Sequence, residues 1–405
     1  MGNDQSQIGV PQANFVRPYT NDIYMPIDAA RTDDERGAAP MPITNFRNKP
    51  IRTPTLLRTA FTGIWSIIIP NCICPAPRTG NFFCHDKNTS TTYIGYGLNT
   101  KNEPLYDFWA LNHLTNRWRE IKLTGTLLCA RTGARAALIG NHIVVFGGYN
   151  DPNYFSDLHT IDINTGKVEL IKTQGPQPVE RSTPVVDIYN NKFYLWGGFN
   201  GEFQTDLFVL DFATMTWSQY PQNVSGRTAV PHAIIGNILY IYGGSKSGGM
   251  LMLNLDTYEM IVKQTTGSEP PSAVMASGMV AVNKYLFFFG GKANSSCTLM
   301  YACDTSKLWW FVFHVMPDGE TVSLVDGTIS EMGLFMVPRI HSFAVAYVKQ
   351  TRQIVAFLGD PPKDPPPLFT VSIGDAMAFI NLREDMSTML KLSILYSNGN
   401  PNPNA

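Results

Sequence analysis

The chain has 405 residues, which is long for a single domain unless that domain is built from repeats. It is 44% hydrophobic and 12% aromatic, so it can bury a large core, and a formal net charge of -1 without a Lys/Arg run argues against electrostatic binding of nucleic acid. Its apolar runs are of strand length and its cysteines number six, which predicts neither a transmembrane helix nor a disulfide scaffold.

Residues 1–60 show no helix or strand period and contain seven prolines, so we expect an extended N-terminal arm. The polar start has no signal-peptide core, and we expect a cytoplasmic location, which includes the cytoskeleton or a cilium. The first residues, Gly2-Asn-Asp-Gln-Ser6, fit the N-myristoylation pattern. Gly2 is either a lipidation site or a chance match, and a single acyl chain would give only marginal membrane binding.

Residues 61–70 are predicted to form one strand around Trp65, which lies 13 residues before Arg78. In the repeats described next, the tryptophan-type position at the end of one unit lies 13 residues before the arginine-type position that opens the next unit in three cases. The strand around Trp65 therefore matches the last strand of a unit whose first three strands do not precede it. We expect it to complete the last unit and close a ring. The apolar segment 389–396 could fill the same place, and the polar tail 397–405 is not expected to order alone.

A sequence pattern returns six times between residues 71 and 396. Each unit is marked by a glycine, which in four units is the second of a Gly pair: Gly97, Gly148, Gly198, Gly244, Gly291 and Gly359. An aspartate-type position and a tryptophan-type position follow, and they are 11 residues apart in five units, as in Asp206 to Trp217 and Thr298 to Trp309. Each unit contains four strand-length apolar segments, and a four-stranded meander cannot bury both faces alone. The sequence therefore predicts an all-β fold, a six-bladed β-propeller with four-stranded antiparallel blades over residues 61–396.

The repeated Gly pairs with the downstream aromatics Trp118, Trp217 and Trp309 resemble the kelch repeat. The pattern departs from the family where Tyr96-Gly97 and Leu358-Gly359 replace the Gly pair, and where Val168 and Met260 replace the tryptophan. The resemblance implies a protein-binding scaffold with a cytoskeletal, ciliary or adaptor role.

An arginine opens five of the units, and Ala273 stands in the fifth position. We predict that these arginines surround the mouth of the central channel: Arg78, Arg131, Arg181, Arg227 and Arg339. They could bind an acidic peptide or a phosphate there, since charge-assisted hydrogen bonds are strong. Alternatively, each could hydrogen-bond carbonyls and carboxylates of its own blade, and the regularity of the pattern favours this structural role.

Two insertions interrupt the last two units. Trp309 and Arg339 are 30 residues apart, against 13 or 10 elsewhere, and a Pro-rich loop follows Gly359. The alternation of strand direction places both on the face onto which the Gly pairs open, beside blade six. We predict that they form a partner-binding ridge with Asp318, Glu320, Asp326, Pro362, Lys363 and Pro366.

Catalytic motifs are missing from the sequence. Gly243–Gly249 is glycine-rich without the P-loop spacing. Cys72, Cys74, Cys84 and His85 could meet around a metal, but C-x-C is not the usual zinc spacing. We therefore predict no catalytic residue, no metal and no cofactor.

The favoured hypothesis is a non-catalytic protein–protein interaction scaffold in a large cytoskeletal or ciliary (axonemal) assembly. In it the arm and the blade-six ridge bind partner proteins, with no role for nucleic acid or a transmembrane segment. The alternatives are an N-myristoylated signalling or trafficking adaptor and, more remotely, an enzyme that uses the channel mouth.

Overall fold

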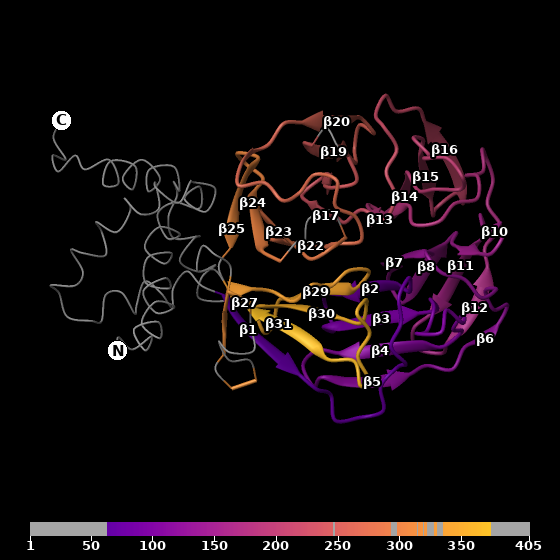
Figure 1. The fold of residues 1–405 in the computed structure, drawn as a ribbon. Helices are drawn as coiled ribbons and strands as arrows, with labels where there is room; N and C mark the ends of the chain where they lie inside the picture. The colour runs from indigo at the N-terminus through magenta and orange to yellow at the C-terminus, as the bar shows by residue number, and fades with distance from the viewer. Residues whose placement is uncertain are drawn as a thin grey trace, which may run out of the picture.

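The computed structural model describes residues 63–245, 248–292, 298–313, 315–318, 320–321, 328–329 and 335–373. All regular elements in these ranges are strands. Six of their sheets stand around a central channel and form a six-bladed β-propeller, and two further sheets are two-stranded hairpins (Figure 1). No helix among the described residues is long and apolar enough to cross a membrane.

Each blade is a four-stranded antiparallel meander in which the chain runs from the channel outward. Blade 1 contains β2 (Phe82–Asp86), β3 (Thr91–Gly95), β4 (Phe108–Asn112) and β5 (Arg117–Glu120); blade 2 contains β7 (Arg135–Ile139), β8 (His142–Phe146), β11 (Leu158–Asp162) and β12 (Lys167–Leu170); blade 3 contains β13 (Val185–Tyr189), β14 (Lys192–Trp196), β15 (Leu207–Asp211) and β16 (Thr216–Tyr220). Blade 4 contains β17 (His232–Ile235), β18 (Ile238–Ile241), β19 (Met250–Asn254) and β20 (Met260–Lys263); blade 5 contains β22 (Gly278–Val282), β23 (Tyr285–Phe289), β24 (Met300–Asp304) and β25 (Trp309–Phe313); blade 6 contains β29 (Ala344–Val348), β30 (Gln353–Phe357), β31 (Leu368–Ser372) and β1 (Gly63–Ile68).

Blade 6 combines the two ends of the described chain. Strand β1 pairs antiparallel with β31 from Ile64↔Ser372 to Ile68↔Leu368, so a strand near the N-terminus fills the outermost regular position. Trp65 is 1% exposed and stacks on Phe369 with ring centroids 5.7 Å apart. The competing segment 389–396, the arm 1–60 and the tail 397–405 lie outside the described residues.

Among the described residues, short parallel pairings link a blade to the next at four of the six junctions. After the fourth strand of a blade, the chain pairs with the outer strand of the following blade: β6 (Thr124–Gly125) with β12, β21 (Thr266–Gly267) with β25, and β26 (Val315–Pro317) with β1. Gln174 makes a single parallel bridge to Thr216 in the same way. The remaining short strands are the hairpins β9 (Tyr149–Asn150) with β10 (Asn153–Tyr154), and β27 (Thr328–Ile329) with β28 (Phe335–Met336).

The repeated tryptophan packs against the preceding blade. Trp217 lies 6.4 Å from Phe146, the residue before the Gly pair of blade 2, and Trp310 lies 4.9 Å from Tyr242, its counterpart in blade 4. The pairing of Cys303 with Trp310 corresponds to that of Leu210 with Trp217. The tryptophan of the fifth unit is therefore Trp310, and the assignment to Trp309 was wrong by one residue.

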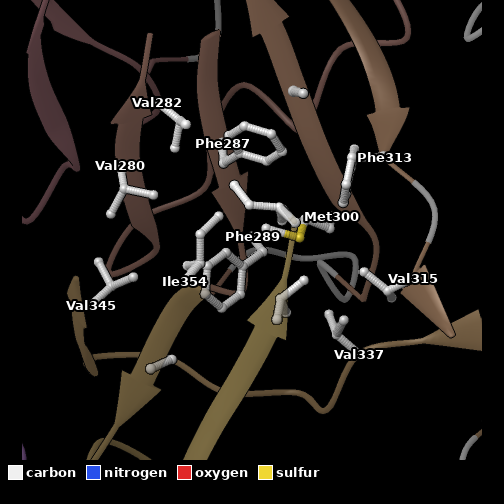
Figure 2. Close-up of a cluster of buried hydrophobic side chains, with 14 of the residues drawn as sticks. Val280, Val282, Phe287, Phe289, Met300, Phe313, Val315, Val337, Val345 and Ile354 are labelled. Carbon is white, nitrogen blue, oxygen red and sulfur yellow. The ribbon is translucent and has the colours of Figure 1, made fainter. Parts of the chain in front are cut away.

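Apolar clusters between neighbouring blades form the core. The largest joins blades 5 and 6, where Phe287, Phe289, Val345 and Ile354 face one another across the interface (Figure 2). Burying each such side chain contributes about 2 kcal/mol. These contacts hold blades 5 and 6 against each other.

Candidate functional site

Three of the predicted arginines form buried ion pairs within their own blades. Arg78 donates both terminal nitrogens to Asp107 at 2.6 Å each, Arg181 donates to Asp206 at 2.7 and 3.3 Å, and Arg131 pairs with Asp157 in the same way. The arginine side chains are 0%, 0% and 1% exposed. Burial alone would raise the pKa of Asp107, but hydrogen bonds and charge from Arg78 outweigh it, and the pKa is lowered.

Backbone carbonyls accept two further hydrogen bonds from each of these three guanidinium groups. Nε of Arg181 donates to the carbonyl of Val179 at 3.0 Å, and its Nη1 also donates to that of Gly197 at 3.1 Å. Arg78 and Arg131 repeat both contacts with their own neighbours. This geometry supports the structural role of the regular arginines, because these contacts engage all three nitrogens of each guanidinium group within its own blade.

The channel mouth is surrounded by residues that lie two positions after the arginines. Their left-handed backbones carry a chain of hydrogen bonds from blade to blade: Gly133 N–H to Gly80, Thr183 to Gly133, Ala229 to Thr183, Ala276 to Ala229 and Ser342 to Ala276. A cavity of about 370 Å³ lies against this ring. The arginines stand behind it, which corrects the expectation that they surround the mouth.

The arginine position of blades 5 and 6 also needs correction. In every unit the second glycine of the Gly pair donates its N–H to the carbonyl of this position in the next blade, as Gly148 does to Arg181. By this contact the last two positions are Val274 and Ile340, each one residue after Ala273 and Arg339. Both are buried apolar residues, whereas the side chain of Arg339 is exposed.

Arg227 of blade 4 is the exception among the buried arginines. It is 4% exposed and donates Nη1 to the Gly243 carbonyl at 2.9 Å, as its counterparts do. The position of the pairing aspartate is Gly249, and among the described residues no carboxylate pairs with Arg227. Its buried Nε has no hydrogen-bond partner. Burial lowers the pKa of Arg227, because the charged guanidinium group is removed from water and no carboxylate among the described residues offsets that cost.

The residues of the predicted ridge differ in exposure and in local hydrogen bonding. Asp318 is engaged locally: its carboxylate accepts from the N–H groups of Glu320 and Thr321 at 3.0 and 2.9 Å. Glu320, Pro362 and Lys363 are exposed, and Pro366 is buried. Asp326 and Gly2 lie outside the described residues.

The cysteine and histidine residues considered for a metal do not converge. Cys74 donates its thiol to the Cys72 carbonyl at 3.3 Å, and burial raises the pKa of Cys84, which lies within β2. His85 contacts Thr92 at 2.9 Å, and Thr92 contacts His113 at 2.7 Å. Within the described ranges, no group of three His, Cys, Asp or Glu side chains is placed to hold a metal ion.

An aromatic surface on blades 2 and 3 was missed by the sequence reasoning. The rings of Tyr149, Tyr154, Phe199 and Phe203 contact one another in series on the loops between the second and third strands. The available signal was the concentration of aromatic residues directly after the two Gly pairs, in segments expected to be polar turns.

Comparison with known proteins agrees with this geometry. The family model described as the KLHDC2/KLHL20/DRC7 Kelch-repeats domain matches residues 55–244 and 185–323, more than half of the chain. The chain belongs to the kelch-repeat family. This kelch protein is 27% identical over 285 residues to Kelch domain-containing protein 2 of Bos taurus, covering 60% of the chain and 70% of the relative.

Two further relatives match a similar part of the kelch chain. Host cell factor 1 of Homo sapiens is 26% identical over 267 residues, covering 54% of the chain, and the chain spans 13% of that relative's length. Kelch domain-containing protein 1 of Mus musculus is 25% identical over 264 residues, covering 55% of the chain and 65% of the relative.

Proposed function

We propose that this kelch propeller is a non-catalytic protein-interaction module that binds an anionic group of a partner protein at Arg227. The observation that carries the proposal is the comparison among the six blades. Blades 1–3 have both the arginine and the aspartate, and blades 5 and 6 have apolar Val274 and Ile340 in place of the arginine. Blade 4 keeps the buried cation where the aspartate position has become Gly249.

The energetic cost of this arrangement supports a binding role. A buried charge that has lost its partner costs about 3–5 kcal/mol relative to the intact pair. An apolar residue, as in blades 5 and 6, would avoid that cost. Retention of Arg227 is accounted for if a partner supplies the missing anion in the complex.

The chemistry of the site restricts the ligand to a carboxylate or a phosphate. A guanidinium group presents its donors as a planar fork that matches either anion. In blade 3 the equivalent fork of Arg181 binds both oxygens of Asp206. A glutamate, aspartate or phosphorylated side chain of the partner would replace that carboxylate at Arg227.

Selection from a random peptide library displayed on phage tests the proposal without a known partner. We expect peptides enriched in acidic residues on the wild-type protein, and loss of that enrichment on Arg227→Met. Lys284→Met is the matched control, because Lys284 already pairs with Asp304 at 2.9 Å. If acidic peptides were enriched equally on Arg227→Met and on Lys284→Met, the proposed role of Arg227 would be wrong.

Membership of a cytoskeletal or ciliary assembly is a finer part of the same proposal, supported by the family resemblance alone. In it the arm 1–60 and the exposed loop residues Pro362 and Lys363 bind further partners. Crosslinking and pulldown from native extract, with and without residues 1–60, measures the contribution of the arm. Identical partner sets would exclude that contribution.

A further inference from the structure

The aromatic surface of blades 2 and 3 forms a continuous series of side chains at one end of the propeller. Tyr149 and Tyr154 have ring centroids 4.6 Å apart, Tyr154 and Phe199 are 6.4 Å apart, and Phe199 and Phe203 are 5.3 Å apart. Tyr149 lines the cavity at the channel mouth, and Phe203 is 57% exposed. The series therefore extends from the channel onto open surface, and β10 marks its position beside blade 3 in Figure 1.

Backbone hydrogen bonds hold this surface in place. Tyr149 donates its N–H to the Thr132 carbonyl at 2.8 Å, and Phe199 donates to the Ser182 carbonyl at 3.0 Å. The β9–β10 pairing fixes Tyr154 opposite Tyr149. The rings are thus positioned before any partner arrives, which reduces the entropy lost on binding.

The exposed charges on the loops that carry the rings are acidic, whereas the arginines nearby are buried or half-buried. Asp151, Glu180 and Glu202 are exposed, and the segments 149–157, 179–182 and 199–206 present no exposed lysine or arginine. The carboxylate of Asp151 accepts a hydrogen bond from the Tyr149 hydroxyl at 2.7 Å, which raises the pKa of that hydroxyl and places the negative charge at the ring edge. Aromatic faces flanked by carboxylates attract cations through both the ring quadrupole and direct charge.

We propose that these loops bind an arginine-bearing extended segment of a protein partner, with guanidinium groups stacked on the Tyr154–Phe203 series and paired with Asp151, Glu180 and Glu202. Arginine fits better than lysine, because its planar group stacks on a ring while it keeps donors for a carboxylate. The protein already contains one such contact, since the Arg131 guanidinium lies 3.9 Å from the centroid of the Phe155 ring. This inference rests on the proposed role in protein binding but not on Arg227, which recognises the opposite charge.

Fluorescence anisotropy with a labelled peptide of Ser-Gly-Arg repeats tests the proposal on the full chain. We expect the peptide to bind, and the same peptide with citrulline in place of arginine to bind about tenfold more weakly, because citrulline keeps the shape and loses the charge. Phe203→Ala and Glu202→Gln should each weaken binding about fivefold. Leu114→Ala and Glu259→Gln are the matched exposed controls on other loops and should leave it unchanged.

Equal binding of the citrulline peptide, equal losses in the controls, or no binding of the arginine peptide would each overturn the proposal. Near-ultraviolet circular dichroism of every variant checks that the propeller is intact. Failure here is distinguishable from failure of the proposed anion site, because that site is measured by selection of acidic peptides on Arg227→Met.

Discussion

The backbone N–H of Gly359 in blade 6 donates to the carbonyl of Arg78 in blade 1 at 3.1 Å. This bond repeats across the joint of the ring the contact that Gly148 makes with Arg181 inside it. Trp118 of blade 1 also packs on Phe357 of blade 6, with ring centroids 5.6 Å apart. The first and last blades are therefore joined by the same glycine-to-carbonyl hydrogen bond and the same kind of aromatic contact as blades that follow one another in sequence.

Trp65→Ala is expected to weaken the closure of blade 6. The side chain is 1% exposed and lies in the largest apolar cluster, so its removal should cost about 3–5 kcal/mol in the free energy of unfolding. Urea denaturation followed by circular dichroism measures the change. Ile73→Ala is the control, since that side chain is 82% exposed and should lose little. An equal effect of the two substitutions would show that β1 does not contribute to stability.

Arg181→Met and Arg227→Met should differ in their effect on stability. The first substitution leaves the Asp206 carboxylate without its partner and should cost about 3 kcal/mol. The second removes a cation without a counter-charge among the described residues, so we expect it to cost less by about 2 kcal/mol or to stabilise. The same denaturation experiment decides this. Equal losses would mean that Arg227 already has an anion in the free protein.

Gly197→Ala and Gly201→Ala separate steric contact from backbone strain. Both glycines have positive φ, +69° and +106°, so both substitutions should lose about 1 kcal/mol. A Cβ at Gly197 would also lie 2.6 Å from the Arg227 carbonyl, whereas at Gly201 it would meet nothing within 4 Å. We therefore expect a clearly lower midpoint of thermal unfolding for Gly197→Ala. Similar midpoints would show that the loop can move away from the glycine pair.

Two histidines of blade 1, the buried His113 and the half-buried His85, should make the protein less stable as the pH falls. Burial and then neighbouring positive charge lower the pKa of His85 to about 4 and that of His113 to about 3. The unfolded chain binds these protons near pH 6.5, so it holds more protons than the folded state below that pH. Stability is therefore present above about pH 6.5 and is lost as the pH falls towards 4, with a slope approaching about 1.4 kcal/mol per pH unit for each histidine.

His113→Asn tests this dependence directly. The slope of unfolding free energy between pH 6.5 and 4 should decrease by up to about 1.4 kcal/mol per pH unit. The same substitution at His142, whose side chain is 50% exposed, is the comparison. An unchanged slope in His113→Asn would contradict the assignment of a depressed pKa to that ring.

The repeat intervals were sufficient to predict the six-bladed architecture, because Gly pairs and spaced aromatics are requirements of the scaffold. They failed where two similar residues are adjacent. Counting cannot choose between Trp309 and Trp310, and only the pairing of Cys303 with Trp310 decides. Arg339 matches the arginine of the other units in residue type, but the position itself is occupied by the adjacent apolar Ile340.

The two candidate binding sites could not be predicted from the sequence, and the reason is different. The importance of Arg227 depends on a carboxylate that is present in blades 1–3, and it becomes visible only when the ion pairs are compared in space. The aromatic series crosses from one blade to the next between Tyr154 and Phe199, two residues that are 45 positions apart in the chain. No local pattern indicates such a contact.

The position of β1 has a consequence for biosynthesis. Among the strands of the described residues, β1 leaves the ribosome first and its partner β31 leaves it last. While blades 1 to 5 form, β1 therefore remains an unpaired and partly apolar edge, the kind of segment that aggregates or recruits chaperones. A nascent chain that stalls before residue 368 would expose both β1 and the incomplete blade 6, so translation must reach β31 before the protein can be released in a closed form.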